Sequence, residues 1–168
     1  DNASHLMNTA GVPQYVAILL DVRGVTSPEA VDCFLNQTDS GFCDPMVFRD
    51  MDLAVERIHQ GLENGERIAV YGDYDADGVT ATVILYSYLE TLGADVVYYI
   101  PDRETEGYGM NCDAIRTLAE DGVTLLITVD NGVSAVEEVD YAKMLGMDVV
   151  ITDHHRPREV LPNAVAVV

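Results

Sequence analysis

Acidic and imidazole side chains follow four short apolar runs of the sequence, at the points where the runs end. The four polar segments are Gly72–Gly78, Pro101–Arg103, Asp130–Gly132 and Asp153–His155. A single aspartate in such a place usually caps the helix that follows, so one segment alone would carry little functional meaning. Four segments of the same kind indicate instead that their side chains serve one shared site.

Carboxylates and imidazoles are suitable ligands for Mn²⁺ or Mg²⁺, and no cysteine lies in the four segments. Asp73, Asp75 and Asp77 alternate along the chain, so in an extended conformation they project to one side about 6.6–6.8 Å apart. A turn at Gly78 can bring them closer, and crowded acids repel one another unless cations lie among them. Two ions roughly 3.5–4 Å apart could hold a phosphate group and activate a hydroxide that attacks it.

The apolar runs belong to a regular alternation of strands and helices that begins at Arg67. The expected strands are 67–71, 95–100, 123–129, 147–152 and 164–168, and the expected helices are 79–92, 113–120 and 135–145. This alternation predicts a doubly wound α/β domain over residues 67–168, with a mainly parallel sheet and helices on both faces. In this fold class the carboxyl ends of the strands meet at one edge, where ligands bind.

Residues 1–66 are expected to form a small helical leader that packs on this domain. A short buried helix is predicted over residues 13–20, ending near Gly24. Ser27, Pro28 and Glu29 have the residue types of a helix start, which are a capping hydroxyl, a proline and then an acid. A third helix is predicted from Asp50 to Gly65.

The composition is acidic, with 29 acidic and 9 basic residues and a formal net charge of −20. A nucleic-acid-binding protein usually has a basic surface. Three explanations stay open: the ligand is not a nucleic acid, the basic surface lies outside these residues, or metal ions neutralise the acidic groove. No apolar run approaches the roughly 18–20 residues of a membrane span. We therefore expect a soluble protein without a membrane partner, and the three scattered cysteines favour the reducing cytoplasm.

Two other interpretations of the acidic segment fail. The segment Asp73–Gly78 matches the first half of a calcium-binding EF-hand loop, but the twelfth position, which needs glutamate, is Ile84. A phosphate-binding nucleotide loop would need a glycine-rich run that ends in lysine and a hydroxyl residue, and the only lysine is Lys143.

The segments resemble the motifs of the DHH phosphoesterase superfamily. The first three motifs correspond to Gly72–Thr80, Thr128–Gly132 and Asp153–His155. The segments Tyr99–Arg103 and Glu106–Gly109, and the leader segments Arg23–Val25, Asp44–Pro45 and Met51–Ala54, are similar to its RecJ branch. The resemblance implies a Mn²⁺- or Mg²⁺-dependent hydrolase of DNA repair and recombination that degrades single-stranded DNA from its 5′ end.

The resemblance also implies a set of metal ligands. Asp75 and Asp130 would hold one ion, with Asp73 as a further ligand or a neighbour of the ligands. Asp77, Asp130 and His154 would hold the other ion, so that Asp130 bridges the two.

Further residues are expected to contact the substrate. His155 would contact the scissile phosphate or its leaving oxygen, and Asp153 would orient a histidine. Arg103 is expected to contact a 5′-phosphate, and Tyr108 to support the terminal base by stacking.

The family's fourth motif, a further metal-binding aspartate, and its second domain are missing before Val168. We therefore expect a fragment that is poorly active alone. Two alternatives to the DNA exonuclease stay open. One is a relative acting on oligoribonucleotides, cyclic dinucleotides or pyrophosphate. The other is a non-catalytic scaffold for replication or repair proteins, although no motif carboxylate is lost.

Overall fold

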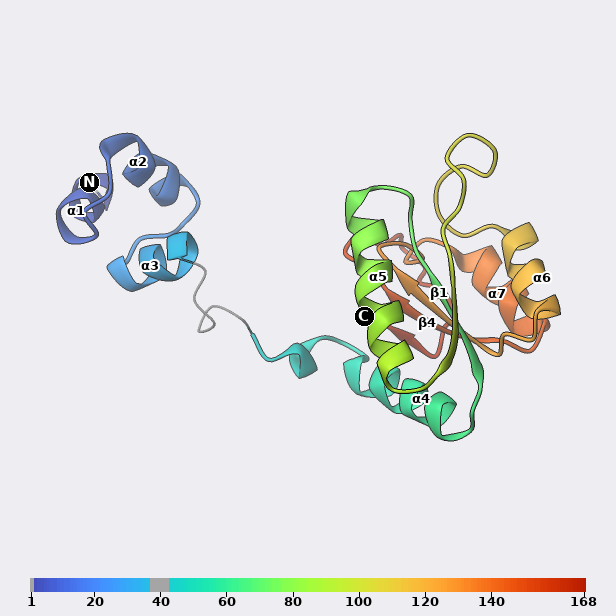
Figure 1. Ribbon diagram of the computed structural model, residues 1–168. Helices are drawn as coiled ribbons and strands as arrows, with labels where there is room; N and C mark the ends of the chain where they lie inside the picture. Colours follow the sequence, from blue (N-terminus) through green and yellow to red (C-terminus); the bar gives the residue numbers. More distant parts are fainter. Residues whose placement is uncertain (1, 37–42) are drawn as a thin grey trace. The chain divides into compact units, whose positions relative to one another are not determined.

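The structure is a computed structural model that describes residues 2–36 and 43–168 (Figure 1). Contacts divide the chain into two compact units, Asp1–Pro45 and Met46–Val168. No helix in the described part of the chain is both long and apolar enough to cross a membrane.

The described residues of the first unit form three helices, α1 (Asn2–Thr9), α2 (Gln14–Val22) and α3 (Pro28–Asn36). Its small core contains Ala3, Leu6, Ala17, Leu20 and Val31. The predicted start of α3 is confirmed, because the Ser27 hydroxyl accepts a hydrogen bond from the Ala30 backbone N–H at 3.1 Å. The sequence predicted a short buried helix here. In the structure the buried residues of α2 are Ala17 and Leu20, so only one face of this helix is buried.

The second unit is built on a five-stranded parallel sheet with the strand order β2-β1-β3-β4-β5. The strands are β1 (Arg67–Tyr71), β2 (Asp95–Tyr99), β3 (Leu125–Val129), β4 (Asp148–Thr152) and β5 (Ala166–Val167). The predicted parallel α/β architecture is confirmed. Strand order reverses between β1 and β3, so the crevice beyond their carboxyl ends is the expected place for a ligand.

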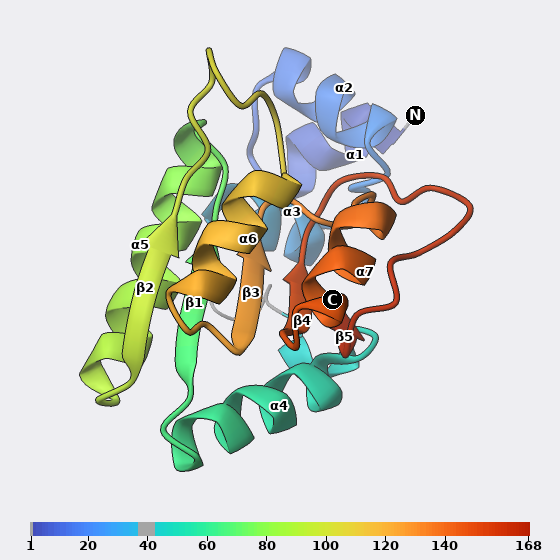
Figure 2. The ribbon, with the colours of Figure 1, turned by 90° about the vertical axis from the view of Figure 1, so that its right-hand side faces the viewer.

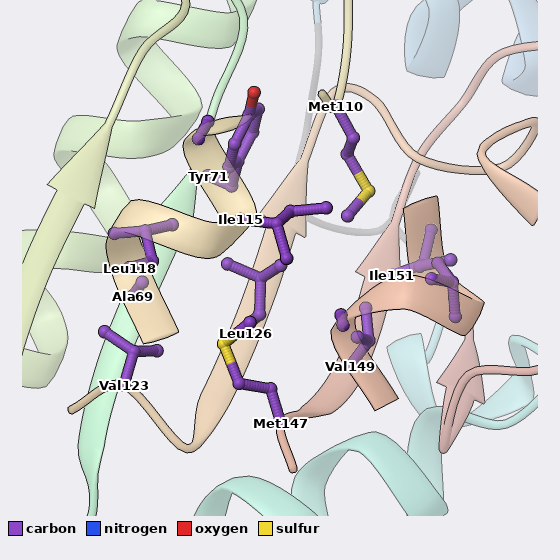
Figure 3. Close-up of a cluster of buried hydrophobic side chains, with 13 residues drawn as sticks. Ala69, Tyr71, Met110, Ile115, Leu118, Val123, Leu126, Met147, Val149 and Ile151 are labelled. Carbon is purple, nitrogen blue, oxygen red and sulfur yellow. The ribbon is translucent and has the colours of Figure 1, made fainter. Parts of the chain in front are cut away.

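Helices cover both faces of this sheet, as the alternation predicted (Figure 2). The helices of the second unit are α4 (Met51–Glu63), α5 (Ala76–Thr91), α6 (Cys112–Glu120) and α7 (Val136–Met144), with a short 3₁₀ turn at Pro45–Val47. Ile115 and Leu118 of α6 pack on one face of the sheet (Figure 3). Val139 of α7 belongs to the same cluster of buried side chains. Ala54 of α4 and Leu89 of α5 pack on the other face.

Helix α4 belongs to the second unit by its contacts, although the sequence grouped it with the leader. Its Arg57 side chain, 11% exposed, connects the helix to the residue that precedes β1 and to the first residue of β4. The guanidinium donates to Glu66 Oε2 and to Asp148 Oδ2, both at 2.7 Å. The hydrogen bond from Arg57 is the main reason that the pKa of Glu66 lies below its ordinary value.

We predict that Arg57→Met lowers the free energy of unfolding at pH 7 by about 1–3 kcal/mol, because Glu66 loses charged hydrogen bonds. Since the folded-state pKa of Glu66 is depressed, its stabilising contribution is present above the unfolded pKa of about 4.3 and is lost as the pH falls through the folded value. Urea denaturation at pH 7 and near pH 3 measures both effects.

The control is Arg116→Met, which removes an exposed pair with Asp113 and should change stability by less than about 1 kcal/mol. An Arg57→Met effect that is equally large at both pH values would contradict the role of Glu66.

Candidate metal centre

The turn between β1 and α5 is packed so closely that it buries Asp73. A Cβ atom at Gly72 would lie 2.0 Å from Thr82 Oγ1, and one at Gly78 would lie 2.6 Å from the Asp73 carbonyl oxygen. Only glycine therefore allows α5 to approach the end of β1 this closely. As a result Asp73 is 1% exposed, immediately beyond the strand.

Asp75 begins helix α5 and points its carboxylate into the same region. One of its oxygens accepts a hydrogen bond from the Gly78 backbone N–H at 3.0 Å, which is the main cause of a pKa below the ordinary aspartate value. Asp75 therefore caps helix α5, which is the usual role of an aspartate at this place. Its side chain is exposed, and the capping hydrogen bond uses only one of its two carboxylate oxygens. Asp77 lies exposed in the first turn of α5.

Asp130 directly follows β3 and has an unusual backbone conformation, with φ of 62°. This left-handed conformation is uncommon outside glycine, although aspartate and asparagine adopt it more readily than other residues. The adjacent Asn131 fixes the loop, because its side-chain amide donates to the carbonyl oxygens of Tyr71 at 3.2 Å and Val129 at 3.0 Å. The loop therefore joins the ends of β1 and β3 and holds Asp130 between them.

Asp153, which follows β4, accepts hydrogen bonds on both of its carboxylate oxygens. Its Oδ2 accepts from the Val133 backbone N–H at 2.9 Å, and its Oδ1 accepts from the His155 backbone N–H at 3.0 Å. The same Oδ1 lies 2.7 Å from Nδ1 of the His155 ring, and this hydrogen bond is the main reason that the pKa of His155 is raised. Asp153 therefore orients His155 and has little capacity left for a metal ion.

The three loops bring potential ligand atoms together in two groups that share Asp130. One group is Asp73, Asp75 and Asp130, and the other is Asp130, His154 and His155. Within each group the ligand atoms lie within 4.8 Å of one another. His154 Nε2, for example, is 2.9 Å from Asp130 Oδ1. An acid shared by two groups is the arrangement that a bridged pair of cations requires.

The chemistry of the buried carboxylates fits divalent cations. In the described part of the chain, neither oxygen of Asp73 accepts a hydrogen bond, and the Asp130 carboxylate has only the His154 ring nitrogen, 2.9 Å from Oδ1, although all four oxygens are buried. Burial, and then the negative charges of Asp77 and Asp75, raise the pKa of Asp130. Buried carboxylates without donors are costly, and oxygen and imidazole ligands suit Mn²⁺ or Mg²⁺.

Asp77 is the one predicted ligand that lies outside both groups. It lines a cavity of about 470 Å³ together with Asp130 and His154, so it remains close to the second group. Its place in the first turn of α5 exposes its side chain to solvent.

Two of the three predicted substrate-binding residues, Arg103 and Tyr108, lie on the loop between β2 and α6. The Tyr108 hydroxyl is 3.3 Å from the ring nitrogens of His155, and burial raises its pKa to about 12. Arg103 is not among the metal-binding groups. Its guanidinium lies 5.4 Å from the centre of the Tyr74 ring, and Tyr74 contacts Tyr108 edge to face.

Sequence reasoning missed Tyr74 and Glu106. Tyr74 lies between the predicted ligands Asp73 and Asp75, and this position in the sequence could have indicated that it belongs to the site. Glu106 organises the loop that carries Arg103 and Tyr108, because it accepts hydrogen bonds from the Tyr99 hydroxyl and from the Asp102 backbone N–H. An exposed glutamate in a loop gives no sign of such a role in the sequence.

The fold and the site together define a parallel α/β domain whose strand ends carry carboxylate and imidazole groups that could hold divalent cations. Residues 67–168 match the model of the DHH family, N-terminal domain. This match covers more than half of the chain, and the chain belongs to the DHH family.

Individual relatives of this chain are exonucleases of the RecJ type. The chain is 45% identical over 168 residues to the single-stranded-DNA-specific exonuclease RecJ of Bacillus subtilis (strain 168), covering 100% of this chain and 21% of that protein. It is similar to the crystal structure of RecJ in complex with Mn²⁺ from Thermus thermophilus, with 28% identity and a TM-score of 0.75, covering 98% of this chain and 22% of that one. For the Mg²⁺ complex from the same organism the TM-score is 0.50 at 28% identity, covering 92% and 18%. The chain thus spans about a fifth of the length of these relatives.

We predict that Mn²⁺ raises the melting temperature of the chain and that Asp130→Asn abolishes this rise. At a Mn²⁺ concentration about a hundred times the Kd, the rise should be on the order of 5 °C. Asparagine tolerates the left-handed backbone, and it removes a buried charge, so the metal-free variant should melt no lower than the wild type.

The control is Asp140→Asn, which removes an exposed acid from α7 and should leave the Mn²⁺ effect intact. An equal Mn²⁺ effect in wild type and Asp130→Asn would exclude Asp130 as a ligand.

Proposed function

We propose that the protein is a Mn²⁺- or Mg²⁺-dependent phosphodiesterase that removes nucleotides from the 5′ end of single-stranded DNA. The observation that carries this proposal is the Asp130 carboxylate, which is shared by two groups of potential ligand atoms at the strand-order switch. The similarity to an exonuclease described as specific for single-stranded DNA supports the substrate class.

The first ligand group, Asp73, Asp75 and Asp130, would hold one cation. Asp130 and His154 would hold the second, with Asp77 close by. When bound, a cation pair neutralises charge on the scissile phosphate and increases the acidity of a water molecule that attacks it.

His155 has the position of a group that contacts the scissile phosphate or its leaving oxygen. Asp153 binds Nδ1 of its ring, so a substrate would meet the Nε2 side, where the Tyr108 hydroxyl lies 3.3 Å away. Because Asp153 also favours the protonated ring, His155 can donate a hydrogen bond to an oxygen that is gaining negative charge. Tyr108 contacts the same ring and limits its movement.

The cluster of Arg103, Tyr74 and Tyr108 suits the end of a DNA strand. Arg103 has no ion pair in the described part of the chain, and its guanidinium can form charged hydrogen bonds to a terminal phosphate. The exposed Tyr108 ring offers a surface on which a base can stack. Single-stranded DNA is thus the partner, and a cytoplasmic location with other replication or repair proteins belongs to the same proposal.

The test is an assay of strand shortening by the intact protein in its natural length. With Mn²⁺, we expect a single-stranded DNA labelled at its 3′ end to shorten progressively, whereas the same strand should persist in excess EDTA. A duplex with blunt ends serves as the control substrate and should be degraded far more slowly.

Intact, metal-loaded protein that leaves single strands unchanged would refute the proposal. Faster cleavage of a dinucleotide than of a long strand would move the activity to the short substrates that other family members use.

A further inference from the structure

A second cavity, of about 790 Å³, shares His155 with the second ligand group and contains no other member of either group in its walls. Its walls come from the residues around Tyr108, from residues 132–138 at the start of α7, and from His155, Arg156 and Arg158. This volume is within the range of about 300–1,000 Å³ that small-ligand sites occupy. The cavity can therefore accept a nucleotide-sized group next to the reacting phosphate.

Almost all the basic side chains of this chain have contacts outside this cavity. The sequence contains eight arginines and one lysine. Seven of these nine residues contact an acid, a carbonyl oxygen or an aromatic ring; they are Arg23, Arg49, Arg57, Arg67, Arg103, Arg116 and Lys143. The other two, Arg156 and Arg158, are exposed and form no ion pair among the residues that the structure describes, and both line this cavity.

The start of helix α7 adds hydrogen-bond donors to the same cavity. Ala135 is the residue just before this helix, and its side chain cannot accept a hydrogen bond from the backbone N–H groups of the first turn. Those N–H groups have no partner within the helix and attract anions. The arginines and the uncapped N–H groups thus favour the same kind of ligand by different interactions.

Two acids oppose this tendency. Glu137 and Glu138 also line the cavity, and neither is paired with Arg156 or Arg158 in the described structure. An anion in the cavity would therefore be attracted by the loop that follows β4 and repelled by these two side chains. The balance makes the affinity sensitive to a change of charge on either side.

We propose that this cavity is a phosphate-binding subsite, in which Arg156 and Arg158 contact a phosphate group of a nucleotide adjacent to the scissile bond. The proposal rests on the proposed function, because the cavity borders His155. The phosphate belongs either to the uncleaved part of the strand or to the mononucleotide that cleavage releases.

The test uses Arg156→Gln/Arg158→Gln in the intact protein. We expect KM for single-stranded DNA to rise about tenfold and by more than kcat falls, because exposed arginines contribute mainly to binding. The dependence of log(kcat/KM) on log salt should become less steep by about 0.7 for each phosphate that the variant no longer binds. Glu137→Gln should lower KM, and Arg116→Gln, on the surface of α6, should leave every value unchanged.

Calorimetric titration with a deoxynucleoside 5′-monophosphate separates the two sources of the phosphate and does not depend on activity. Weaker mononucleotide binding in the double variant indicates the released product, and a higher KM with unchanged mononucleotide binding indicates the strand. A double variant that matches Arg116→Gln in KM, salt dependence and mononucleotide binding overturns the subsite. A wild-type protein that degrades no single-stranded DNA contradicts the proposed function and not the subsite. In that case the calorimetric titration still decides whether the cavity binds phosphate.

Discussion

Two buried carboxylates are the constraint on which the architecture of this site depends: Asp73, which accepts no hydrogen bond in the described structure, and Asp130, which has only the His154 ring beside it. Removing a charged carboxylate from water costs several kcal/mol unless a countercharge replaces the lost hydration. Within the site, burial and the negative charges of Asp77 and Asp75 raise the pKa of Asp130 by more than the nearby His154 ring lowers it. A pair of divalent cations would satisfy all of these groups at once.

The fold keeps these acids together through backbone features more than through side-chain pairing. Gly72 and Gly78 let α5 approach β1 closely enough to enclose Asp73, and the left-handed backbone of Asp130 places its carboxylate between two loops. Asn131 connects the ends of β1 and β3 by hydrogen bonds to both. Strain in a non-glycine residue at such a point persists only where the surrounding structure enforces it.

Much of this arrangement could be predicted from the sequence. The strands from Arg67 onward lie within two residues of their expected bounds, because a parallel sheet buried on both faces requires apolar runs of that length. The meeting of three loops at one edge followed from the same topology. Tertiary contacts between distant residues could not be predicted. They determine the placement of α4 on the sheet, the cation–π contact of Arg103 with Tyr74 and the unpaired state of Arg156. The resemblance had implied two groups of ligands that share Asp130, but not that His155 joins the second group and that Asp77 lies outside both.

The central claim is that Asp130 joins two cations, and a crystal of the chain grown with Mn²⁺ tests it most directly. An anomalous difference map should contain two peaks roughly 3.5–4 Å apart, with the Asp130 carboxylate in contact with both. A map without peaks near Asp130, or with a single ion that Asp130 does not contact, would contradict the account.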